Sequence, residues 1–131
     1  MRRLTVIGAA LVLVPAASAS SKPKTGFEFG RTGGSIAPFT LTVATTGAVH
    51  ATGAAPDHRT RLSKEQLALL NRVAFVVDFE HLAPVTACAT TLPDVAAQFI
   101  RVGNRTVRVH GGCVARFNRL WNALSAATRA G

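Results

Sequence analysis

The sequence lacks the short motifs that mark the common nucleotide-binding and hydrolytic sites. It has no P-loop, no dinucleotide-binding fingerprint and no G-x-S-x-G elbow around a serine. It also has no recognisable nucleic-acid-binding motif, and no apolar run after residue 14 is long enough to span a bilayer. Because no convincing catalytic constellation remains, we expect a protein that is not an enzyme and that holds neither a metal nor a cofactor.

Acidic residues are scarce: six Asp and Glu stand against fifteen Lys and Arg, which gives a formal net charge of +9. A basic surface favours polyanions or acidic partners and speeds their encounter. Nucleic acid is the usual partner for such a charge, but the expected export of the chain argues against it. Anionic cell-envelope polymers, lipid head groups and an acidic protein remain, and the charge also fits a role in solubility alone.

The first residues have the pattern of a secretory signal peptide. A basic start precedes the apolar run Leu4 to Val14, and small residues follow up to Ala19. The apolar run rises only about 16 Å as a helix, which is too short to cross a membrane. We therefore expect a signal peptide over 1–19, a flexible leader over 20–26 and one domain over 27–128. The protein would be secreted, periplasmic or held in the cell envelope, without stable membrane insertion.

Alternating apolar residues predict several short strands. Residues 27–31, 39–44 and 48–52 form the first three candidates, and a turn at Thr46-Gly47 joins the last two. Residues 94–102 and 105–110 form a hairpin around Gly103-Asn104, where glycine in the first turn position suits a type II′ turn. With that turn, Ile100 faces Val107 and Phe99 faces Arg108.

Two helices complete the expected fold. Ser63 and Gln66 have the spacing of a capping box, and apolar residues then recur at helical intervals. The second helix runs from about Val114 to Ala127. Its apolar stripe consists of Phe117, Leu120, Trp121 and Leu124. The order β-β-β-α-β-β-α predicts the α+β class, with an antiparallel sheet of about five strands and both helices on one face.

The two cysteines allow three interpretations. An even count in an exported chain favours a disulfide between Cys88 and Cys113, worth about 3 kcal/mol in the chain-entropy model. His81 and His110 together with both cysteines would supply four zinc ligands, although their spacing matches no compact zinc motif. Cys113 near His110 would also suit a thiolate nucleophile. We expect the disulfide.

One face of the predicted hairpin carries a basic patch. If the turn lies at residues 103–104, Phe99, Arg101, Arg108 and His110 share that face. Arginine and aromatic residues are enriched in interfaces. The patch is a candidate binding surface, and the alternative is an ordinary solvated sheet face.

Short motifs spread over about residues 27–126 follow the order seen in one known family. They are Arg31–Gly34, Phe39–Val43, Leu62–Leu67 with Leu70, Phe79–Leu82, Asp94, Thr106–Val109, Leu120 and Leu124. This pattern resembles the emfourin-type inhibitors of thermolysin-like zinc metalloproteases and a related bacterial domain of unknown function. The resemblance implies a small α+β inhibitor that blocks a protease without catalysis of its own. Those inhibitors lack the cysteine pair and usually lack an export signal, and a shared fold does not by itself carry over inhibition.

A glycine-containing loop is the candidate surface for a protease. Gly33 and Gly34 let the backbone approach a partner closely, Ser35 follows them, and Ile36 or Phe39 would serve as an apolar anchor. The alternative is a loose connection with Ile36 packed in the core. The predicted function is therefore an exported binding domain that inhibits thermolysin-like metalloproteases. The alternative is a cell-envelope module that binds anionic polymers through its basic sheet face.

Overall fold

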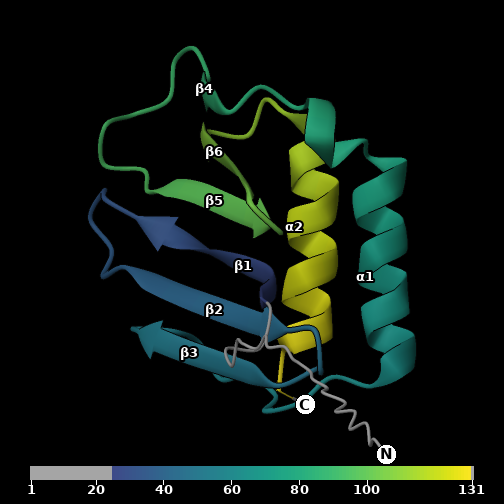
Figure 1. The fold of residues 1–131 in the computed structure, drawn as a ribbon. Helices are drawn as coiled ribbons and strands as arrows, with labels where there is room; N and C mark the ends of the chain where they lie inside the picture. The colour runs from purple at the N-terminus through teal and green to yellow at the C-terminus, as the bar shows by residue number, and fades with distance from the viewer. Residues whose placement is uncertain (1–24, 131) are drawn as a thin grey trace, which may run out of the picture.

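The computed structural model describes residues 25–130, which form a β-sheet with two helices on one of its faces (Figure 1). Along the chain the elements are β1 (Thr25–Thr32), β2 (Phe39–Ala44), β3 (Val49–Gly53), α1 (Lys64–Val76), the 3-10 turn η1 (Phe79–His81), β4 (Val85–Ala87), β5 (Ala97–Val102), β6 (Arg105–His110) and α2 (Ala115–Thr128). The strands lie in the order β3-β2-β1-β5-β6-β4, and α1 packs beside α2. The predicted α+β class is confirmed.

The N-terminal predictions fall largely on residues that the structure does not describe. The expected signal peptide, 1–19, and most of the expected leader, 20–26, lie outside the described residues. The leader prediction was wrong at its end, because Thr25 and Gly26 belong to β1 and Thr25 pairs with Ala44 of β2. Between residues 25 and 130, no helix is long and apolar enough to cross a bilayer.

The sheet has six strands and is mixed, whereas the sequence predicted about five strands, all antiparallel. The additional strand is β4, which pairs with β6 in the parallel direction. At its two ends, the N–H of Arg108 donates to the carbonyl of Pro84 at 2.8 Å, and that of Cys88 donates to His110 at 2.9 Å. A strand of three residues is too short to show an alternating pattern, so hydrophobic periodicity does not reveal it.

The β5–β6 hairpin has the predicted register. Ile100 pairs with Val107 and Phe99 pairs with Arg108 across the two strands. Gly103 has a φ of +60°, a conformation that glycine adopts without strain. The predicted turn position is confirmed, and the register places Ile100, Val107 and Val109 on the helix-covered face, where they are buried. The paired residues Phe99 and Arg108 lie on the opposite, open face together with Arg101.

The first helix begins where the capping pattern predicts. The N–H of Gln66 donates to the hydroxyl of Ser63 at 3.1 Å, and the N–H of Ser63 donates back to the Gln66 side chain at 2.8 Å. These two bonds satisfy donors that the first helical turn would otherwise leave unpaired. Leu70 and Ala74 on the inner side of α1 are buried.

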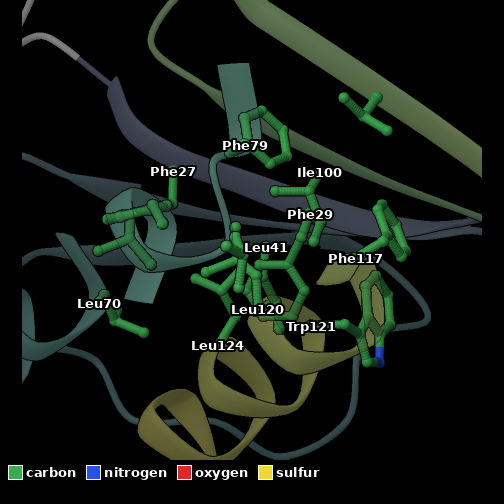
Figure 2. Packing of buried hydrophobic residues seen from close by; sticks show 14 of the residues in the cluster. Phe27, Phe29, Leu41, Leu70, Phe79, Ile100, Phe117, Leu120, Trp121 and Leu124 are labelled. Carbon is green, nitrogen blue, oxygen red and sulfur yellow. The ribbon is translucent and has the colours of Figure 1, made fainter. Parts of the chain in front are cut away.

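The core fills the space between the sheet and the two helices (Figure 2). The Phe29 ring of β1 packs edge-on against the Trp121 indole of α2, with 5.3 Å between the ring centroids. The Phe117 ring stacks on the same indole, with 6.3 Å between the centroids. Each large apolar side chain that is fully buried contributes roughly 1.5–3 kcal/mol through removal from water. The stripe predicted for α2 is buried in full: Phe117, Leu120, Trp121 and Leu124.

Candidate functional site

The two ends of the sheet differ in how their strands are connected. At one end, short turns at residues 45–48 and 103–104 join the strands, and we call this the hairpin end. Four connections begin or end at the other end: residues 33–38, 88–96, 111–114 and the segment after β3. We call residues 33–38, 88–96 and 111–114 the loop end (Figure 1). Binding residues are disproportionately found on loops that a rigid scaffold positions. The loop end is therefore the part of the molecule to inspect first.

The first two connections of the loop end are joined by hydrogen bonds. The N–H of Ser35 donates to the carbonyl of Asp94 at 3.0 Å, and the Ser35 hydroxyl donates to the same oxygen at 3.3 Å. Gly34 lies in the close approach between the loops, since a Cβ added there would lie 2.6 Å from the backbone of Asp94 and of Ala96. Only a glycine fits this contact with a φ of +65°. Residues 33–38 are thus held against residues 94–96.

A disulfide fixes the third connection. Cys88 and Cys113 are bonded with their Cα atoms 5.7 Å apart, which confirms the predicted pair. His110, one residue before the 111–114 connection, has its Nε2 2.7 Å from the carbonyl oxygen of Val95. Because both sulfurs are in the cross-link, neither is a thiolate, and the zinc-site and nucleophile interpretations were wrong. In the part of the chain that the structure describes, no group of three or more His, Cys, Asp or Glu is placed to hold a metal ion.

Three large apolar side chains are exposed on the loop end. The exposed fractions are 40% for Ile36, 64% for Leu92 and 43% for Val95. Ile36 and Val95 also border a hollow of about 360 Å³, which Gly111 and Gly112 line as well. Exposed apolar side chains beside a concave surface are typical of a protein interaction site.

The predicted partner-binding residues are divided between the loop and the core. Gly33, Gly34, Ser35 and Ile36 are all exposed in the 33–38 connection. Ile36 is not packed in the core, so the loose-connection interpretation was wrong about its position. Phe39 begins β2 and packs half-buried against the core, away from the loop surface. Of the two residues predicted as apolar anchors, only Ile36 is exposed on the loop.

Leu92 and Val95 were missed by sequence reasoning. They lie in a connection without helical or strand periodicity, where the hydrophobic pattern carries no information. The signal that was present is Pro93-Asp94 between them, a dipeptide that marks a turn and so exposes its neighbours. Nothing in the sequence alone places this turn beside residues 33–38.

The predicted basic residues share the open face of the sheet, but most of them have partners there. Arg101 lies 3.5 Å from a carboxylate oxygen of Glu28 on the neighbouring strand. The Arg108 guanidinium lies over the Phe99 ring, 6.0 Å from its centroid, and donates to the Thr32 hydroxyl at 3.3 Å. An arginine paired with a carboxylate is a weaker attractor for a polyanion than a free one. The predicted residues therefore do share one face, but the Glu28 carboxylate offsets part of the positive charge on that face.

Comparison with known proteins adds no relative. A scan against protein-family models found no match, and searches of curated proteins and of solved structures found none either.

Proposed function

We propose that this chain is an exported, non-catalytic binding domain that inhibits a thermolysin-like metalloprotease by docking its loop end against the enzyme. One observation carries the proposal: exposed apolar side chains project from connections that are held together by hydrogen bonds and a disulfide. Ile36 lies one residue from the Ser35–Asp94 bonds, and Val95 lies next to Asp94 on the other loop.

Held loops favour tight binding for a physical reason. Association costs free energy for each loop and side chain that it immobilises, and this cost falls when the loop is already ordered. Apolar residues at the centre of an interface, once shielded from water, supply most of the gain. The loop end combines both properties, because its three connections are bonded to one another and Ile36, Leu92 and Val95 are exposed.

The class of partner comes from the resemblance to emfourin-type inhibitors, whose quoted motifs include Gly33-Gly34 on the same loop. The disulfide supports the export part of the proposal, because disulfides form and persist in oxidising compartments outside the cytoplasm. An extracellular or periplasmic domain would meet secreted metalloproteases there.

A titration of the purified exported protein against several thermolysin-like proteases tests the proposal. We expect saturable inhibition at micromolar concentration or below. Ile36→Ala and Leu92→Ala should each weaken it by tenfold or more, about 1.4 kcal/mol. The matched control is Leu69→Ala on α1, which removes a side chain of similar exposure, 57%, from a distant surface. If micromolar concentrations of the domain inhibit none of the proteases tested, the proposal is contradicted.

The alternative function is a cell-envelope module that binds anionic polymers through the open face. The observation in its favour is that Arg101, Arg108 and His110 lie on that face together. The Arg101–Glu28 pair weighs against it, because the carboxylate offsets one of these positive charges. Ionic strength separates the two functions, because polyanion binding falls steeply with added salt while an apolar interface changes little.

A further inference from the structure

A second hollow lies on the helix-covered side of β1 and β2, and Arg31 borders both this hollow and the one at the loop end. Its volume is about 430 Å³, and α2 and the segment that follows β3 bound it. Pockets for small organic ligands typically measure about 300–1,000 Å³ and combine apolar walls with a few polar groups. This hollow fits that description, since its walls include Phe29, Phe39 and Trp121 together with Arg31, Asp57 and Arg129.

Trp121 and Arg31 both line this hollow and contact each other. Arg31 lies over the indole, with its guanidinium carbon 5.4 Å from the ring centroid. Figure 2 shows Trp121 at the edge of the core cluster, next to Phe117, with its indole nitrogen on the outer side. A guanidinium that stacks through its flat face keeps its N–H donors in the plane available for a carboxylate. Among residues 25–130, no carboxylate lies within ion-pair distance of Arg31.

A second arginine, Arg129, borders the same hollow, and its backbone is held in place. The backbone of Arg129 is bridged to His58, and its carbonyl accepts a hydrogen bond from Arg59 Nε at 3.0 Å. Asp57 is the one acidic residue that lines the hollow. Two arginines and one aspartate therefore line the hollow, which gives its lining residues a net positive charge beside an apolar wall.

We propose that this hollow binds a small amphiphilic monoanion, a carboxylate on an apolar body of medium-chain length. The carboxylate would pair with the in-plane donors of Arg31, and the apolar body would lie against Phe39 and Trp121. Charge-assisted pairing between arginine and a carboxylate is strong when water is partly excluded. The proposal goes beyond protease inhibition and does not rest on it.

Trp121 supplies the measurement, because it is the one tryptophan of the chain and it lines the hollow. The purified exported protein is titrated with decanoate below its critical micelle concentration while tryptophan emission is recorded. Decanol and decyltrimethylammonium serve as probes of the same chain length without the negative charge. We expect a saturable emission change with decanoate, and at least tenfold weaker binding of the other two probes.

Substitutions then show which arginine pairs with the carboxylate of decanoate. Arg31→Gln should weaken decanoate binding at least tenfold, and Arg129→Gln about threefold. Arg116→Gln, which removes an exposed cation of α2 outside the hollow, should leave binding within twofold. Circular dichroism checks that each variant is folded. If Arg31→Gln does not fold, Arg129→Gln alone tests the proposal. The proposal is overturned by the absence of a saturable change, by equal binding of decanol, or by folded variants that all bind like the parent.

Discussion

The hairpin end joins β5 to β6 through Gly103-Asn104 alone, whereas the loop end uses residues 88–96 to join β4 to β5. None of the described turn residues at 45–48 or 103–104 is a large exposed apolar side chain. The loop end exposes Ile36, Leu92 and Val95, and it contains the disulfide. Both ends belong to one sheet, so the sheet itself does not require the longer connections or the cross-link.

The difference separates what folding of the sheet requires from what it does not require. A two-residue turn joins two antiparallel strands with the smallest loss of chain entropy. Long connections that expose apolar side chains cost stability, and a cross-link offsets part of that cost. If the loop end is a binding surface, substitutions there should weaken binding by more than their loss of stability explains. Matched substitutions at the hairpin end should change stability without a separate effect on binding.

The largest effect on stability should follow removal of the cross-link. Replacing both Cys88 and Cys113 with serine should lower the free energy of unfolding by about 3 kcal/mol, because the disulfide closes a loop of about 25 residues in the unfolded chain. Urea denaturation measures this loss. Hydrogen exchange should rise first in residues 88–96, while the hairpin end keeps its relative protection. A loss below about 1 kcal/mol would mean that hydrogen bonds alone hold the loop end.

The two glycines of the first loop should differ from each other. Gly33 and Gly34 both have positive φ, so alanine is strained at either position. A Cβ at Gly33 meets nothing within 4 Å, whereas one at Gly34 meets the backbone of the neighbouring loop. Gly33→Ala should cost about 1 kcal/mol, and Gly34→Ala about 2–3 kcal/mol. Equal values in a denaturation series would argue against the close contact between the two loops.

The hairpin end offers the matched control for Gly33. Gly103 also has a positive φ, and a Cβ added there also meets nothing within 4 Å. Gly103→Ala should therefore cost about the same 1 kcal/mol as Gly33→Ala. Protease inhibition should be unchanged in Gly103→Ala and reduced in Gly33→Ala, which an inhibition assay at fixed protein concentration detects. Loss of inhibition in both variants would mean that stability, and not the loop surface, determines the effect.

The smallest effect should come from the open face. Arg101→Gln removes the pair with Glu28, and both side chains remain partly exposed, at 41% and 28%. Exposed ion pairs contribute at most about 1 kcal/mol, so we expect a loss of about 0.5 kcal/mol that shrinks further with added salt. A larger loss would show that this face is more than a solvated surface.

Local patterns in the sequence predicted much of the fold. The Ser63–Gln66 capping box, the α2 stripe and the β5–β6 register depend on neighbouring residues, and all three are present as expected. β4 was not predicted because a three-residue strand depends on its distant partner β6. The loop end was predicted in part, through Gly33 to Ile36 and the cysteines.

The rest of the site depends on contacts that sequence patterns do not encode. The bonds between Ser35 and Asp94 join residues that lie 59 positions apart, and neither loop has a repeating pattern. Arg31 was noted only as part of a motif, and its position over Trp121 follows from how α2 packs on β1. Such contacts appear only once the sheet and the helices are placed against each other.

Hydrogen exchange of the domain bound to an inhibited thermolysin-like protease tests the central claim most directly. We expect new protection in residues 33–38 and 88–96 of the complex, with exchange at 45–48 and 103–104 unchanged from the free domain. Protection confined to the hairpin end or to the open face of the sheet would contradict it, because the apolar side chains of the loop end would then take no part in binding.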